Sequence, residues 1–231
     1  MPYLPYIDTW YLILVIPTVI LSLIASASVR STYAKYSKVP SLRGMTGGDL
    51  AAEILRRAGI YDVRVELVSG QLTDHYSPKE NVIRLSEGVY GSSSVAALGV
   101  AAHEAGHVLQ YYGNYAPIRI RNSILPVVNF SSGLSVPIIL LGFFLGFSLL
   151  VNIGIALFFF VVLFQLITLP VEFNASSRGM RQLESCGALS SEELPLAKKV
   201  LSAAAMTYVA SLAVSLAQFL RLILISNGRR R

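Results

Sequence analysis

The sequence predicts a mainly α-helical membrane protein with about four transmembrane helices and a small α+β domain. The 231 residues are 54% hydrophobic and only 14% charged, whereas a soluble domain carries about 25% charged residues. Residues 122–171 contain no Asp, Glu, Lys or Arg, and polar residues gather instead in residues 28–123. Composition excludes a disordered chain, and a disulfide-rich secreted module is excluded because Cys186 is the only cysteine.

Residues 1–27 are predicted to form an N-terminal transmembrane anchor, with an apolar run over residues 9–27. The alternative is a signal peptide, because Ala25-Ser26-Ala27 resembles a cleavage site. A signal peptide has a positively charged segment before its apolar run, but Asp8 is the only charged residue there. We therefore expect an anchor that is retained.

The uncharged region, residues 124–171, is too long for one membrane helix, which needs about 20 apolar residues. It predicts two helices, over residues 124–146 and 149–169, with a turn near residues 147–152. Residues 172–202 are predicted to be a helical segment. Residues 203–231 are predicted to be a C-terminal helix, spanning the membrane or lying at its interface, with a basic tail.

The polar region, residues 28–123, is predicted to be the α+β domain. Thr46 can cap a helix over residues 49–55, and Gly59 follows its end. Apolar and charged residues alternate over 63–67, which is the periodicity of a strand, and residues 81–86 predict a second strand. Residues 94–112 predict a helix that begins after a run of serines and stops at Gly113.

The last of these helices carries His103-Glu104-Ala105-Gly106-His107, the pattern HExxH. Histidines four residues apart lie one turn apart on one helix face, so both imidazoles can reach one zinc ion. The glutamate that follows the first histidine is then placed to act as a general base. We therefore predict one Zn²⁺ per chain, with His103 and His107 as ligands and Glu104 as the catalytic base.

A catalytic zinc site normally has three protein ligands, and the residues leave the third open among His75, Glu172 and another carboxylate of the polar domain. Topology favours Glu172. Two membrane helices between His107 and Glu172 return the chain to the same side of the membrane, whereas one or three helices would not. Glu172 is also the first charged residue after the uncharged region.

The chain resembles the YugP-like membrane zinc metallopeptidases, the neutral zinc metallopeptidase family, over nearly its whole length. The resemblance rests on residues 72–76, 100–107, 169–176 and 207–210. It extends more distantly to the HtpX heat-shock membrane proteases and the CAAX prenyl proteases. It implies a zincin-like catalytic domain, with zinc held by His103, His107 and Glu172 and with Glu104 as base. There are two departures: Ser176 stands where the distant relatives have aspartate, and Asn174 stands where aspartate is expected in close relatives.

Two further site predictions concern substrate. His75 could steady the oxyanion or contact a ligand, although an Asp-His pair in a turn before proline is more often structural. Zinc peptidases often bind substrate as an added antiparallel strand, and the second predicted strand offers such an edge. Its residues are Asn81, Val82, Ile83, Arg84, Leu85 and Ser86.

The sequence therefore predicts a membrane-embedded zinc endopeptidase that hydrolyses membrane or misfolded proteins near the bilayer surface. A zinc-binding membrane scaffold without proteolytic activity is the alternative, although it would not need Glu104. A transporter is disfavoured because the uncharged region has no ionisable residue. Arg178 and Arg181 are expected to pair with Glu184 or with lipid phosphate.

The predicted location is a bacterial cell membrane, crossed several times, with lipid and a protein or peptide substrate as partners and no nucleic acid. The net charge of +6 fits basic residues beside membrane spans. The positive residues that flank the spans place the catalytic domain in the cytoplasm: Arg30, Lys35, Lys38, Arg43, Arg119 and Arg121. Arg229–Arg231 oppose this orientation if the last helix spans the membrane.

Overall fold

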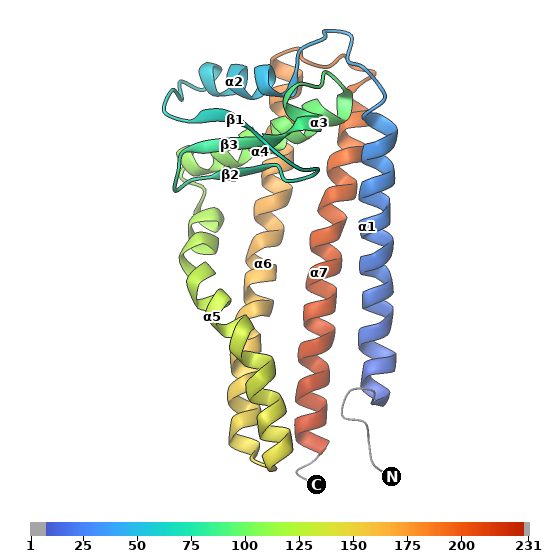
Figure 1. Ribbon diagram of the computed structural model, residues 1–231, viewed down its shortest axis with the longest axis vertical. Coiled ribbons are helices and arrows are strands. Elements are labelled where there is room, and N and C mark those ends of the chain that lie inside the picture. Colours follow the sequence, from blue (N-terminus) through green and yellow to red (C-terminus); the bar gives the residue numbers. More distant parts are fainter. Residues whose placement is uncertain (1–7, 229–231) are drawn as a thin grey trace. The chain divides into compact units, whose positions relative to one another are not determined.

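The computed structural model describes residues 8–228, which divide into two compact units (Figure 1). One unit comprises the described parts of Met1–Ser26, Pro117–Pro170 and Met206–Arg231; the other comprises Ala27–Ala116 and Val171–Ala205. We call them the apolar unit and the polar unit. The basic tail Arg229–Arg231 and the first seven residues of the predicted anchor lie outside the described residues.

Long helices build the apolar unit, and most of them continue into the polar unit. They are η1 (Tyr11–Val15) with α1 (Ile16–Tyr36), α5 (Ala116–Leu145), α6 (Ser148–Ser185) and α7 (Leu194–Gly228). Among the described residues, four helices are long and apolar enough to cross a membrane, the number that hydropathy predicts. Their bounds differ from the prediction. The turn between α5 and α6 is confined to Gly146 and Phe147, and Gly146 takes the positive φ of 67° that such a reversal needs.

The second uncharged helix does not end at residue 169, as the sequence suggested, but continues through Pro170 to Ser185. The residue before a proline disfavours helical geometry, yet proline is tolerated inside apolar helices when neighbours satisfy the backbone. Glu172 therefore lies within α6 rather than at the start of a separate segment. The last helix likewise begins at Leu194 instead of residue 203.

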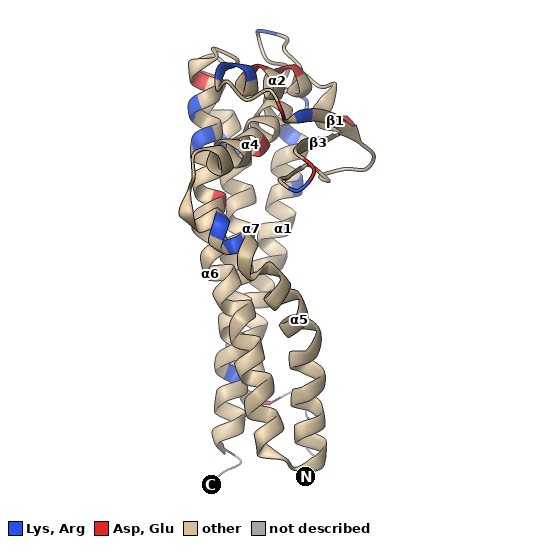
Figure 2. Ribbon diagram, turned by 90° about the vertical axis from the view of Figure 1, so that its left-hand side faces the viewer, with Lys and Arg blue, Asp and Glu red and all other residues tan. Residues whose placement is uncertain are grey.

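Charged residues are scarce in the apolar unit. Its described residues include only Asp8, Arg119, Arg121 and Arg221. In Figure 2, blue and red segments lie on α2, on the strands and on parts of the long helices, while α5 beyond its first turns is uncoloured. Helix α4 contains a single charged residue, Glu104. The difference in charge indicates that the surfaces of the two units are suited to different surroundings.

The polar unit contains a three-stranded mixed sheet with the order β1-β3-β2. β3 (Val82–Ser86) pairs in parallel with β1 (Arg64–Val68) and antiparallel with β2 (His75–Ser77). β3 is therefore the central strand. The expectation that residues 81–86 form a free edge for substrate is wrong, because neighbouring strands already pair with both sides of β3. The edges of the sheet belong to β1 and β2.

Helices α2 (Gly47–Arg57), α3 (Glu87–Tyr90) and α4 (Val95–Tyr112) pack with the sheet. The caps that the sequence predicts are present. Thr46 and Asp49 form a capping box at the start of α2. Ser94 Oγ accepts a hydrogen bond from Ala97 N at 3.2 Å, and α4 ends at Gly113. The fully buried core includes Leu50, Ile83 and Leu98, so apolar residues of α2, β3 and α4 fix the position of α4.

Candidate metal site

Helix α4 carries His103 and His107 on the same face, one turn apart. Their ring centroids are 4.8 Å apart and the rings are nearly perpendicular, at 83°. The rest of α4 is rich in small buried residues, among them Ala101, Ala102 and Ala105. Small residues let a neighbouring helix approach the α4 backbone closely.

That neighbour is the C-terminal part of α6, and two glycines set its distance. A Cβ at Gly106 would lie 2.4 Å from Ala175 O, and a Cβ at Gly179 would lie 2.7 Å from Ala102 O. Any side chain at either position would therefore push the two backbones apart. Gly106 stands between the two histidines, so this close approach occurs where α6 presents Glu172.

The three predicted ligands meet in one place. Glu172 Oε2 lies 3.3 Å from His103 Nε2 and 3.4 Å from His107 Nε2, and one ligand atom from each residue lies within 4.8 Å of the others. Zinc–ligand bonds of about 2.0–2.1 Å at tetrahedral angles place neighbouring ligand atoms about 3.3 Å apart. The two spacings that join Glu172 to the histidines therefore match edges of such a tetrahedron, and two imidazoles with a carboxylate are a donor set that zinc takes.

The opposite nitrogen of each imidazole has a protein partner. His103 Nδ1 lies 3.0 Å from Ser176 Oγ, and His107 Nδ1 lies 3.0 Å from Gln110 Oε1. A proton on each Nδ1 would leave both Nε2 lone pairs facing Glu172, as metal ligation requires. Ser176, which departs from the family's aspartate, thus still contacts a histidine.

Sequence reasoning missed Gln110. The available signal was a polar residue three positions after His107, on the same helix face, in an otherwise apolar segment.

Glu104 is buried beside this cluster but is not one of its three converging groups. Burial raises the pKa of its carboxyl to about 7; the neighbouring His103 opposes the shift, and the carboxylates of Glu172 and Asp74 add to it. A carboxylate adjacent to, but distinct from, a metal-binding cluster is suited to exchange protons with a reacting group.

His75 lies at the start of β2 and is exposed, with its Nδ1 2.8 Å from Thr73 O. It is not part of the three-residue cluster, although its charge contributes to the electrostatics of Glu104. Asp74 accepts hydrogen bonds from the backbone N–H and the hydroxyl of Ser86, at 2.7 and 3.0 Å. The structural role expected for the Asp-His turn is thus present in Asp74.

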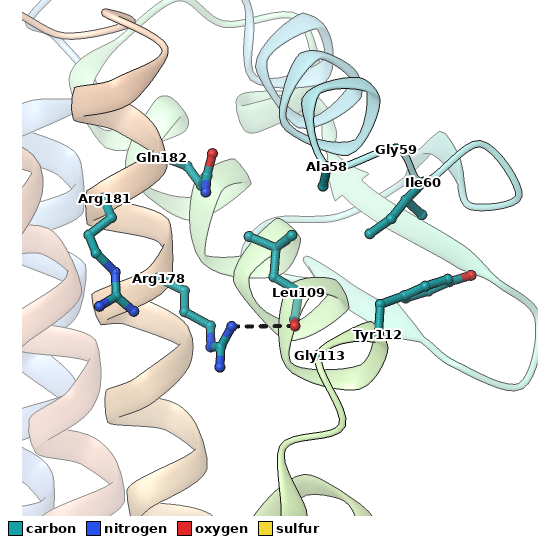
Figure 3. Close-up of a pocket in the computed structure, with 9 residues that line it drawn as sticks. All are labelled: Ala58, Gly59, Ile60, Leu109, Tyr112, Gly113, Arg178, Arg181 and Gln182. Atoms are coloured by element: carbon teal, nitrogen blue, oxygen red, sulfur yellow. Dashed lines mark hydrogen bonds between the residues drawn. The ribbon is translucent and has the colours of Figure 1, made fainter.

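A cavity of about 510 Å³ lies at the C-terminal end of α4, between residues 58–60 of the loop after α2 and residues 178–182 of α6 (Figure 3). None of its lining residues is one of the three converging groups. Arg178 reaches across it, donating to Leu109 O at 3.5 Å and, through Nε, to Asn174 Oδ1 at 2.8 Å. The expected pairing of Arg178 with Glu184 is therefore wrong.

Comparison with known proteins identifies relatives of this chain. Residues 11–227 match the model of a family described as "Putative neutral zinc metallopeptidase". The chain is also 49% identical over 220 residues to a Bacillus subtilis protein described as "Putative membrane protease YugP", covering 95% of this chain and 98% of the relative. No solved structure matches the chain.

Proposed function

Because the chain belongs to this zinc metallopeptidase family, and because two imidazoles and a carboxylate converge within it, we propose that it is a membrane-embedded zinc endopeptidase. The observation that carries the proposal is the spacing of 3.3 and 3.4 Å between Glu172 Oε2 and the two Nε2 atoms. That spacing is the edge of a zinc tetrahedron. The substrates proposed are membrane proteins or misfolded proteins that reach the bilayer surface.

His103, His107 and Glu172 would hold one Zn²⁺ and leave a fourth position open. Bound zinc would lower the pKa of a water molecule and polarise the carbonyl of the scissile peptide bond. Glu104 takes the proton from the attacking water on a carboxylate oxygen and then delivers it to the nitrogen of the leaving amine. Its buried position beside His103 supports this role.

A peptide substrate can extend the sheet only at an outer strand. Of the two, β2 packs against α4, and we propose β2 as the strand along which the substrate aligns. His75, at the start of β2, would then lie beside the substrate backbone.

The proposal is tested by two glutamine variants that separate the base from the ligand. Glu104→Gln keeps the shape of the side chain but removes the basic oxygen, so zinc should stay bound while cleavage falls by about 10²–10⁴-fold. Glu172→Gln should lose zinc affinity. The measurements are zinc content and cleavage of a fluorescently labelled unfolded protein by purified full chain, with Glu184→Gln on the exposed side of α6 as the matched control.

The scaffold alternative gives a different result. A scaffold would bind zinc through the same three residues, would cleave nothing, and would be indifferent to Glu104→Gln. If Glu104→Gln instead releases zinc while Glu172→Gln retains it and remains active, the assignment of base and ligand is wrong.

A further inference from the structure

Gln110 is a fully buried glutamine on α4, with a relative exposure of 0%. Its Oε1 lies 3.0 Å from His107 Nδ1. Its Nε2 donates to Val171 O at 2.7 Å and to Asn174 Oδ1 at 3.1 Å. The side chain therefore contacts a histidine of α4 at one end and α6 at the other.

The orientation of this amide follows from its partners, because a side-chain amide has one accepting end and one donating end. Val171 O is a backbone carbonyl and can only accept. Arg178 is always protonated and donates through Nε to Asn174 at 2.8 Å, so Asn174 must present its oxygen. Both groups on the α6 side are acceptors, and the NH₂ of Gln110 must face them.

The protonation of His107 follows in turn. Once the NH₂ of Gln110 faces α6, its Oε1 faces His107 and can only accept. His107 Nδ1 must then carry the proton. In the neutral imidazole this leaves the lone pair on Nε2, the atom 3.4 Å from Glu172 Oε2.

Gln110 also joins the two helices that supply the predicted ligands. Val171, whose carbonyl it binds, directly precedes Glu172 in α6. One buried side chain thus fixes His107 on α4 relative to the backbone that carries Glu172.

We propose that Gln110 is a positioning residue of the metal site, which holds His107 in the tautomer that ligates through Nε2 and holds α6 in register with it. The inference rests on the proposed zinc site and adds a residue to it. If Gln110 only filled space in the core, replacing it by a residue of similar volume would leave zinc binding unchanged, whether or not an oxygen stands in the place of Oε1. This difference makes the inference testable.

The experiment compares Gln110→Met with Gln110→Glu in the full chain purified in detergent. Methionine keeps the volume but has no comparable acceptor, whereas glutamate keeps an oxygen for His107 Nδ1 and, in its protonated form, an O–H that can donate to Val171 O in place of the amide. The dissociation constant for Zn²⁺ is measured by competition with a chelator. We expect Gln110→Met to weaken zinc binding by about 10–100-fold, as loss of a ligand's partner typically does, and Gln110→Glu to recover most of that loss.

Gln182→Met is the matched control, since Gln182 lines the cavity on α6 and its Oε1 accepts a hydrogen bond from Ser185 rather than from a histidine. It should bind zinc as the unmodified chain does. Equal zinc affinities for Gln110→Met and the unmodified chain, or equal losses in Gln110→Met and Gln110→Glu, would overturn the proposal. An unmodified chain that binds no zinc would instead overturn the proposed function.

A second measurement needs no variant of Gln110. The chain has three histidines, so ¹⁵N-histidine labelling gives a simple NMR spectrum of the zinc-loaded protein, and a His75→Asn variant identifies the exposed residue. His107 should show zinc on Nε2 and a slowly exchanging proton on Nδ1. Zinc on Nδ1, or an Nδ1 proton that exchanges freely with water, would contradict the proposal even if Gln110→Met does not fold.

Discussion

The polar and apolar units place their apolar side chains in opposite ways. In the polar unit, large apolar residues such as Leu50 and Ile83 are fully buried, and most charged residues lie outside; Glu104 and Glu172 at the site and Glu193 are buried exceptions. In the apolar unit, Leu23 is 66% exposed and Phe144 is 88% exposed. An apolar exterior with almost no charge is stable only when its surroundings are apolar as well. One chain therefore combines a unit that has its apolar residues inside, as a water-soluble domain does, with a unit whose apolar surface is suited to lipid.

The two units also treat a carboxylate among buried groups differently. In the apolar unit, Asp8 is closed off by Arg221, whose NH2 lies 2.6 Å away and whose guanidinium also stacks on Tyr11 at 4.9 Å. In the polar unit, Glu172 faces two imidazole nitrogens. A guanidinium neutralises a carboxylate permanently, whereas neutral imidazoles leave it free to share a cation. The first arrangement is suited to stabilising the fold, and the second is the one for which we propose a chemical role.

The largest effect on stability is expected from substitutions that break the ion pair between Asp8 and Arg221 in the apolar unit. Removing one partner of a fully buried pair costs roughly 3–5 kcal/mol; because the Asp8 side chain is 27% exposed, the cost here should lie at or below the lower end of that range. Asp8→Leu should cost more than Arg221→Leu, because a carboxyl can become neutral by protonation and a guanidinium cannot. Unfolding of the chain in detergent measures both. The double variant should regain most of the loss; additive losses would show that the pair is not the stabilising contact.

The next largest effect is expected from a substitution that pushes α4 and α6 of the polar unit apart. Gly106→Ala places a Cβ 2.4 Å from Ala175 O, and overpacking of this kind costs about 1–3 kcal/mol. Zinc affinity should fall as well, because Glu172 moves away with α6.

Gly99→Ala is the control for this substitution, on the same helix. Its Cβ would approach three atoms of Ala197 at 3.7–3.9 Å, which are ordinary contacts, so the greater helix propensity of alanine should leave stability unchanged or slightly higher. Equal behaviour of the two variants in unfolding and zinc titration would contradict the close approach at Gly106.

The smallest effect lies at the outer end of the Gln110 network. Arg178→Met removes the hydrogen bond that orients Asn174, while Val171 O still holds Gln110. One hydrogen bond contributes about 0.5–1.5 kcal/mol, so zinc affinity should fall by about tenfold or less. Arg181→Met, three residues further along α6 and lining the same cavity, should leave it unchanged. If Arg178→Met weakened zinc binding more than Gln110→Met does, Arg178 rather than Gln110 would be the residue on which the site depends more.

The local features of the site could be predicted from sequence, and the non-local ones could not. The bounds of α4, its caps and the face shared by His103 and His107 depend on residues within a few positions of each other. Glu172 could be predicted as the third ligand from the number of membrane helices between it and His107. Strand order could not, because the pairing of β3 with both β1 and β2 depends on residues distant in the chain.

Two errors have a common physical origin. Pro170 marks a helix end by local preference, and Arg178 close to Glu184 suggests a salt bridge by spacing. In the structure, neighbouring elements decide both: α6 continues through the proline, and Arg178 turns to Asn174 and to the carbonyl of Leu109 on α4. Local rules fail where tertiary contacts supply alternative partners.

The contact between Asp8 and Arg221 also has a consequence for the folding of the chain. These residues lie close to its two ends, yet their side chains are 2.6 Å apart. Beyond Arg221, α7 continues for only seven residues, or about 10 Å of helix. The hydrogen bond between Asp8 and Arg221 joins positions 213 residues apart. A contact of such sequence separation closes a very long loop, so we expect it to form late in folding, after the last helix is in place.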